Sequence, residues 1–266
     1  MTLKENNLIQ AAAEKSNTKV AVKSPAQRMR EVLNMNASQS LMGDVLRENK
    51  ESFVASLIDL YGSDNTLAQC DAGAVMREAL KAVSLKLPIN KQLGFAYIIP
   101  YFNNKTGMQE PQFQLGYKGM IQLAQRTGAY KTMNMDNVYA GELRTVNKLT
   151  GEIDLNGERI GDEVVGYFAY IETVNGFSKT LYWPIAKIIE HAQKYSKSYK
   201  SGAAIWKTNF NELAQKTVMR NLISRWGIMS VDMQRAIDYD NADLADEAIV
   251  ADPETGEITP ATGSVE

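Results

Sequence analysis

The sequence predicts an α+β fold in which a central antiparallel β-sheet is flanked by helices. Helical periodicity dominates residues 25–86 and 184–226, whereas short apolar and aromatic runs typical of strands gather between residues 93 and 183. Strands that cluster, instead of alternating with helices, favour an antiparallel sheet. The chain has 266 residues, of which 44% are hydrophobic, so it can build a substantial core.

Three helices are expected ahead of the strands. Pro25 suits the first position of a helix, and the side chain of Asp71 can accept a backbone N–H as a helix cap. Apolar residues recur at helical spacing after each start, and Gly62 and Pro88 are typical of helix ends. The expected helices are Ala26–Met35, a second one from Ser38 or Ser40 to Gly62, and Ala72–Lys86.

Five strands and one short helix are expected in the middle of the chain. A turn or protruding loop at residues 103–107 separates the first two strands, and Asn175-Gly176 is a hairpin signal between the last two. The helix, Met120–Arg126, follows Gly116-Tyr117-Lys118-Gly119. The expected strands are Leu93–Phe102, Pro111–Leu115, Lys131–Tyr139, Glu163–Thr173 and Phe177–Trp183.

The rest of the chain is expected to be helical and then acidic. Pro184 opens a helix, residues 196–202 form a loop, and Ala203–Trp226 forms the longest helix. We expect three regions: a mobile N-terminal arm at residues 1–24, one core at residues 25–230, and an acidic tail at residues 231–266 that begins with a weak helix.

Charge is distributed unevenly along the sequence. The formal net charge is -2, but residues 236–266 hold nine acidic and no basic side chains, which leaves about +7 on residues 1–235. Residues 178–225 alone contain nine Lys or Arg and two Glu. Clustered positive charge attracts polyanions such as nucleic acid. A solvated basic face explains the composition equally well, and both interpretations stay open at this point.

Several classes of function are poorly supported by the residues present. A single histidine, His191, and a single cysteine, Cys70, provide neither a zinc site nor a nucleophile with its base, and we expect a surface position and a small apolar role for them. No phosphate-binding loop or dinucleotide motif occurs, so we expect neither ATP nor NAD as a cofactor. The acidic pair Asp44 and Glu48, with Lys50, suits a solvated helix face better than a metal-dependent nuclease. With no apolar span or signal peptide, we expect a cytoplasmic protein without membrane contacts.

Two constellations carry chemistry suited to nucleic acid. In Gly116-Tyr117-Lys118-Gly119, tyrosine offers a stacking face and lysine a phosphate partner, although a tight strand-to-helix connection explains the glycines as well. Lys216 and Arg220 share one helix face, with Lys207 and Asn211 expected on nearby turns of the same side. Trp206 and Phe210 are favoured for packing, whereas the loop residues Lys197, Tyr199 and Lys200 are expected to be exposed.

The blocks Gln112–Ala124 and Trp206–Arg220 resemble the RecT/Redβ family of phage single-strand annealing proteins, over roughly residues 30–230. The resemblance implies ATP-independent pairing of complementary DNA strands by subunits assembled as rings or filaments, on the strand left by a partner exonuclease. It implies a compact sheet-and-helix core, a basic DNA groove between subunits, and no bond-breaking site. Any magnesium dependence would act through the DNA.

The resemblance also suggests which residues contact DNA. Tyr117, Lys118 and Arg126 match the first block, and Lys207, Lys216 and Arg220 match the second. Charge and position add further candidates: Lys105, Thr106, Gly107, Lys131, Lys197, Lys200, Asn211 and Arg225. For the acidic tail we favour a solvating role, or docking of the exonuclease or of host single-strand-binding protein, over self-inhibition of the groove. A metal-dependent nuclease and a sequence-specific nucleic-acid-binding module are the competing functions.

Overall fold

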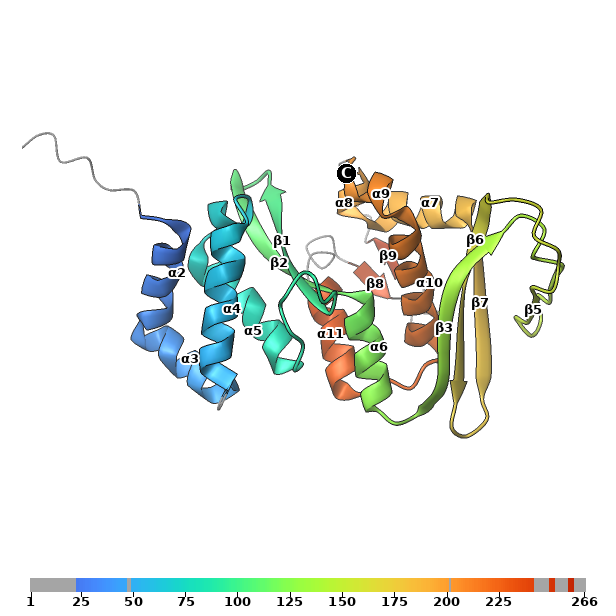
Figure 1. The fold of residues 1–266 in the computed structure, drawn as a ribbon, viewed down its shortest axis with the longest axis horizontal. Helices are drawn as coiled ribbons and strands as arrows, with labels where there is room; N and C mark the ends of the chain where they lie inside the picture. Colours follow the sequence, from blue (N-terminus) through green and yellow to red (C-terminus); the bar gives the residue numbers. More distant parts are fainter. Residues whose placement is uncertain (1–22, 47–48, 201, 242–248, 252–257, 261–266) are drawn as a thin grey trace, which may run out of the picture.

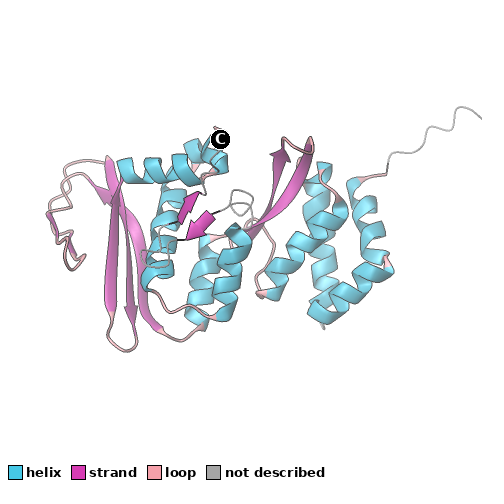
Figure 2. Cartoon of the chain, turned by 180° about the vertical axis from the view of Figure 1, so that it is seen from behind, coloured by secondary structure: helices cyan, strands magenta, loops and turns pink. Residues whose placement is uncertain are grey.

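The computed structural model describes residues 23–46, 49–200, 202–241, 249–251 and 258–260, and it has the predicted α+β class with antiparallel strands flanked by helices (Figures 1 and 2). The described chain forms an N-terminal lobe (residues 25–115) and a C-terminal lobe (residues 130–226) along the long axis (Figure 1). Helices α6 and α11 lie between the lobes. Residues 1–22 of the predicted arm fall outside the described residues.

Helices dominate the N-terminal lobe because its apolar residues recur at helical spacing. Ser24 and Gln27 form a reciprocal capping box at the first helix, and the Asp71 side chain accepts the Ala74 N–H at 2.7 Å, as its capping role predicts. The single helix expected up to Gly62 is instead two helices, because the backbone at Asn49 leaves helical values. The bounds are α2 Pro25–Asn34, α3 Asn36–Leu46, α4 Lys50–Ser63, the 3₁₀ turn η2 Leu67–Gln69 and α5 Ala72–Ser84.

The lobe ends in an antiparallel hairpin of β1 (Ala96–Asn103) and β2 (Met108–Leu115). Strand side chains alternate between faces, so one face of the hairpin buries Ala96, Ile98 and Phe113 in the core. This hairpin is a separate two-stranded sheet. The five expected strands therefore all form, but they divide between two sheets instead of joining a single central one.

The C-terminal lobe is built on a three-stranded antiparallel sheet in the order β3-β6-β7. The turn at Asn175-Gly176 connects β6 and β7 as predicted, and Gly176 has the positive φ of 85° that this turn requires. Between β3 and β6 the turn-rich segment folds a small hairpin of its own. The bounds are β3 Tyr130–Tyr139, β4 Thr145–Val146, β5 Ile153–Asp154, β6 Val164–Thr173 and β7 Ser178–Pro184.

The helix expected over residues 203–226 is interrupted at Asn209, whose φ of -130° and ψ of 39° are not helical. Tertiary contacts explain the break, because the Trp206 indole nitrogen lies 3.2 Å from Ser196 Oγ and 3.0 Å from Ser198 Oγ and so holds the first turn against the preceding segment. The loop expected at residues 196–202 is wrong in part, because residues 197–200 form a short helix. The long helix α10 packs on the three-stranded sheet. The bounds are α7 Ile185–Tyr195, α8 Lys197–Lys200, α9 Ile205–Thr208 and α10 Phe210–Trp226.

The weak helix predicted at the start of the acidic region exists as α11 (Val231–Asn241), and it is part of the packed molecule. Met233 and Ala236 are fully buried, and the helix contacts α6 and β2. Two short strands follow, β8 (Ile249–Ala251) and β9 (Ile258–Pro260). The remaining residues of the predicted tail lie outside the described ones.

One hydrophobic core extends through both lobes. Cys70 is buried just ahead of α5, as predicted, and burial raises the pKa of its thiol to about 11. The surface position expected for His191 is wrong: its ring is half-buried between Trp183 and Tyr195, with centroids 5.2 and 4.8 Å away. Burial, followed by the charge of Arg220, lowers the pKa of His191 to about 4.

Candidate nucleic-acid interface

The second face of the β1–β2 hairpin carries aromatic and amide side chains that are only half-buried. Tyr97 and Tyr101 of β1 lie on the same face as Gln112 and Gln114 of β2. The Gln114 amide donates a 2.6 Å hydrogen bond to the Tyr101 hydroxyl. Aromatic rings and amides are the groups that proteins use to stack on and hydrogen-bond to single-stranded bases.

At the hairpin tip, the predicted loop residues Lys105, Thr106 and Gly107 form an exposed tight turn. Asn103 Oδ1 accepts the Lys105 backbone N–H at 2.8 Å, and Gly107 has a positive φ of 69°. The exposed apolar side chains Phe102 and Met108 flank this turn, with 59% and 57% of their surface accessible. The tip therefore combines one lysine with two apolar groups.

The glycines of Gly116-Tyr117-Lys118-Gly119 allow a close approach within the protein itself. A Cβ on Gly116 would lie 2.0 Å from the Gly94 carbonyl oxygen, and one on Gly119 would lie 2.2 Å from that of Phe95. Of the two roles considered for the glycines, the structure therefore supports the tight connection. They allow α6 (Tyr117–Arg126) to pack against the loop before β1. Lys118 itself is exposed, in the first turn of α6.

Arg126 ends α6 and has structural partners. Its guanidinium donates to the carbonyl oxygens of Leu85 at 2.8 Å and Lys86 at 2.9 Å, just past the end of α5. Lys86 has a positive φ of 55°, which is unusual for a residue with a side chain. Arg126 thereby satisfies carbonyl groups that the end of α5 leaves without helical partners.

Helices α8 and α9 present a second set of cations. Lys200 and Lys207 are exposed; Lys197 begins α8, and its side chain is outside the described part of the chain. Trp206 packs edge-on against Tyr199 and Phe210, so the packing role predicted for Trp206 and Phe210 is confirmed. The exposed position expected for Tyr199 is wrong, because this contact leaves its ring half-buried.

Lys207 does not share a helix face with Lys216 and Arg220, because the break at Asn209 separates α9 from α10. The prediction that Lys207 lies on the same side of one helix as Lys216 and Arg220 is therefore wrong. Asn211 lies on α10, and its side-chain oxygen accepts a 2.7 Å hydrogen bond from the Tyr167 hydroxyl.

Lys216 and Arg220 converge on one carboxylate, that of Asp240 in the last turn of α11. Arg220 donates to Asp240 Oδ2 at 2.5 Å and to Asn241 Oδ1 at 2.6 Å, and the Lys216 ammonium is 3.8 Å from Asp240 Oδ2. The Asp240 side chain is only 5% exposed. Burial lowers the pKa of Lys216, and the positive charge of Arg220 acts in the same direction while Asp240 opposes it.

Two further candidates lie in the C-terminal lobe. Lys131 of β3 forms an exposed 2.7 Å ion pair with Glu172 of β6. Arg225 is exposed in the last turn of α10.

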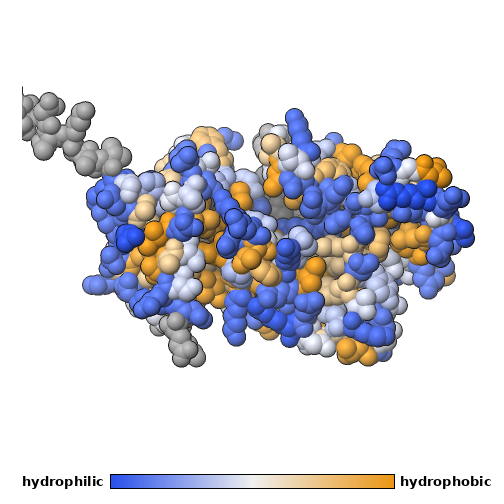
Figure 3. Space-filling view, in the orientation of Figure 1, coloured by the Kyte–Doolittle hydropathy of each residue, from blue (hydrophilic) through white to orange (hydrophobic). Residues whose placement is uncertain are grey.

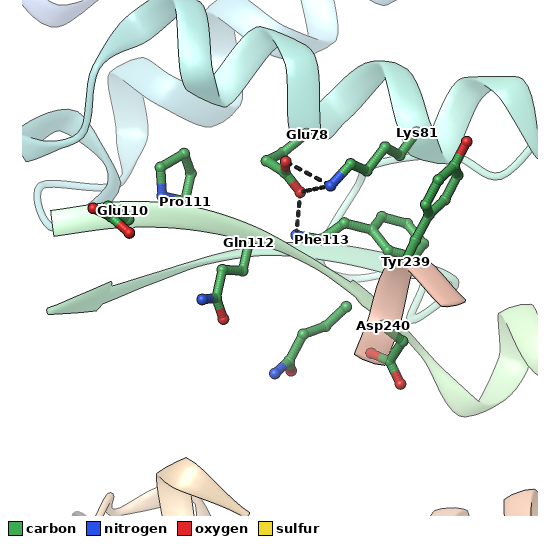
Figure 4. Close-up of a pocket in the computed structure, with 9 residues that line it drawn as sticks. Glu78, Lys81, Glu110, Pro111, Gln112, Phe113, Tyr239 and Asp240 are labelled. Atoms are coloured by element: carbon green, nitrogen blue, oxygen red, sulfur yellow. Dashed lines mark hydrogen bonds and ion pairs between the residues drawn. The ribbon is translucent and has the colours of Figure 1, made fainter. Parts of the chain in front are cut away.

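Carboxylate side chains accept backbone N–H groups at the outer edge of β2 (Figure 4). Glu78 of α5 accepts the Phe113 N–H at 2.8 Å and pairs with Lys81, while Asp240 accepts the Leu115 N–H at 3.0 Å. Pro111, two residues before Phe113, has no N–H to offer. The edge is therefore protected against pairing with another strand.

A pocket of about 160 Å³ follows this edge, lined by Glu78, Lys81, Glu110, Pro111, Gln112, Phe113, Gln114, Tyr239 and Asp240.

The surface is hollowed between the hairpin and α8–α9 (Figure 3). Lys105 and Lys118 belong to the elements on one side of this hollow, and Lys200 and Lys207 to those on the other. Sequence reasoning missed Tyr97, Tyr101, Gln112 and Gln114 as surface candidates. Their alternation with buried residues in the two strands was the signal that could have indicated a shared face.

Among the described residues, no three His, Cys, Asp or Glu side chains are grouped so that they could hold a metal ion. The side chains of Asp44 and Glu48, the suggested nuclease pair, fall outside the described ones. No described helix is both long and apolar enough to cross a membrane.

Comparison with known proteins shows the family of the chain. The RecT family model matches residues 51–255. The chain belongs to the RecT family. This RecT chain is 40% identical over 233 residues to the uncharacterized protein YqaK of Bacillus subtilis (strain 168), which covers 87% of the chain and 78% of YqaK. It is 28% identical over 203 residues to Protein RecT of Escherichia coli (strain K12), which covers 75% of the chain and 72% of that protein. The predicted family is confirmed, and with it a role in DNA binding and single-strand annealing recombination.

Proposed function

We propose that this RecT protein pairs complementary DNA strands without ATP, and that it holds the first strand in the hollow between the β1–β2 hairpin and α8–α9. The half-exposed hairpin face with Tyr97, Gln112 and Gln114 carries this proposal, because exposed lysines occur both in the hairpin turn and on α9. Lysines neutralise phosphates irrespective of sequence, while aromatic and amide groups contact bases.

Annealing in such a site requires no bond to be broken. The protein holds one strand extended, and base pairing with the second strand supplies the specificity. Each correctly stacked step contributes on the order of 1–2 kcal/mol, so mismatched strands are released. His191, the single histidine, packs against aromatic rings and takes no part in this scheme.

The predicted DNA contacts fit the proposal to different degrees. Those for which no side-chain hydrogen bond or ion pair is described above are the leading contacts: Lys105, Tyr117, Lys118, Lys200, Lys207 and Arg225. The further candidates Thr106, Gly107 and Lys197 are neighbours of these contacts in the chain or in the same short helix. Asn211 is a candidate at the start of α10. Arg126 and Lys131 already have partners within the chain, and Lys216 and Arg220 are covered by Asp240.

The proposal includes assembly as a ring or helical filament, because repeated subunits multiply weak phosphate contacts along one strand. It also includes a partner exonuclease that exposes the strand, and docking of that enzyme or of host single-strand-binding protein by the acidic residues after α11. These reactions belong to the cytoplasm of the bacterial host cell. A pull-down with the purified partners tests the docking, and competition by added salt distinguishes charge-driven contacts.

The decisive experiment mixes the full chain with two dye-labelled complementary oligonucleotides in the absence of ATP, with and without magnesium. We expect faster pairing than with a non-complementary control and a rate that falls steeply with salt. Binding without faster pairing would instead identify a plain nucleic-acid-binding module. Shortening of the strands with magnesium would indicate a nuclease.

A further inference from the structure

We propose that Arg220, Lys216 and the Leu115 backbone N–H form a binding seat for a DNA backbone phosphate, and that Asp240 fills this seat when DNA is absent. The inference rests on the annealing function proposed above and adds to it a step in which DNA displaces the end of α11.

The donors around Asp240 are those that a phosphodiester requires. The guanidinium of Arg220 lies 2.5 Å from one carboxylate oxygen, the Leu115 N–H donates to the other at 3.0 Å, and the Lys216 ammonium lies 3.8 Å away. A guanidinium, an ammonium and a backbone N–H converge in the same way on phosphate oxygens. The two cations also outnumber the single carboxylate, so the seat retains an excess positive charge.

The carboxylate comes from a helix end that is poorly suited to hold it. Asp238 and Asp240 lie in the last turn of α11, which has no basic residue, and the negative end of the helix dipole disfavours anions there. The buried side chains of α11 are Met233 and Ala236, nearer its start. The last turn is held by the seat, by the hydrogen bond of Arg220 to Asn241, and by Ile237 and Tyr239, which are only partly buried where they pack against the core.

The seat also opens toward the proposed DNA path. Asp240 and Tyr239 line the same pocket as Gln112 and Gln114 of the hairpin face, and Figure 4 shows Asp240 below β2 beside this strand. Lys216 and Arg220 are 21% and 25% exposed, so both cations reach the surface once the last turn moves. A strand on the hairpin face therefore passes next to the seat.

The test measures single-stranded DNA affinity for the full-length Asp240→Asn variant at fixed salt, with a poly(dT) oligonucleotide as the probe. Asp238→Asn is the matched control, because it removes the same charge from an exposed position of the same turn. We expect Asp240→Asn to bind at least about fivefold more tightly than Asp238→Asn, since the internal competitor has lost its charge. The gain should disappear in the double variant Asp240→Asn, Arg220→Ala.

Equal affinities for the two Asn variants, with melting temperatures close to that of the wild type, would overturn the proposal. If Asp240→Asn does not fold, hydrogen exchange of the wild-type protein decides. Saturating poly(dT) should increase exchange at residues 237–241 and leave residues 231–236 protected, whereas unchanged or increased protection at 237–241 rejects the seat. The annealing assay on the wild-type protein tests the proposed function separately. If Asp240→Asn has the expected effect but the wild type does not anneal DNA, the seat stands and the proposed function is rejected.

Discussion

Lys118 and Arg126 begin and end the same helix, α6, but their charged groups serve different purposes. Lys118 is exposed at the start of the helix, and its side chain lies near Gly94, just ahead of β1. Arg126 donates two hydrogen bonds to the carbonyl oxygens at the end of α5. The same helix thus provides one cation for a ligand and one for the fold, and substitutions can separate the two roles.

Replacing Lys118 with Ala should weaken binding to single-stranded DNA and reduce the slope of log affinity against log salt by about 0.7, the contribution of one phosphate contact. Fluorescence titrations at several salt concentrations measure both quantities. Lys23→Ala is the control, because Lys23 pairs with Glu31 on the surface of α2, at the far end of the N-terminal lobe. A slope that stays unchanged in Lys118→Ala would remove this residue from the interface.

Replacing Arg126 with Ala should destabilise the protein by about 1–3 kcal/mol, since two carbonyl groups lose a charged donor near the strained backbone of Lys86. Urea unfolding gives this value. The salt slope of DNA binding should remain that of the wild type at temperatures where the variant is folded. A reduced slope without a loss of stability would return Arg126 to the DNA contacts.

Replacing Gly116 with Ala should destabilise the protein by about 1–3 kcal/mol or more, because the new Cβ would collide with the Gly94 backbone. The contrasting variant is Gly43→Ala in α3, where a Cβ meets nothing within 4 Å. That substitution should stabilise the helix by about 0.5–1 kcal/mol. Thermal melts of the two variants should therefore shift in opposite directions, and a shared direction would contradict the close approach at Gly116.

The buried His191 should make stability depend on pH. Because its pKa falls from about 6.5 to about 4 on folding, the unfolded chain binds an additional proton between these values. Stability is fully retained above pH 6.5 and falls as the pH drops toward 4, by up to about 1.4 kcal/mol per pH unit. His191→Phe should flatten this part of the profile relative to the wild type in denaturant unfolding at pH 4.5 to 7.5. Identical profiles would show that the ring is accessible to protons in the folded state.

The acidic end of the chain illustrates the limits of pattern reading. Composition marks residues 236–266 as acidic, and helical spacing indicates a weak helix at residue 232. Nothing in that pattern shows that Asp240 meets Arg220, twenty residues earlier, and the N–H of Leu115 on a distant strand. Those contacts depend on how α11 packs against β2.

The α+β class, the cap at Asp71, the turn at Asn175-Gly176 and the family could be predicted from the amino acids alone. Caps, turns and periodicity are local, and the two motif blocks are continuous. Tertiary structure alone decided the break at Asn209, the burial of His191 and the division of the strands between two sheets. It also decided which cations already have partners, as Arg126 and Arg220 do. Such outcomes follow from contacts between residues far apart in the chain, and the spacing of residue types along the sequence does not predict these contacts.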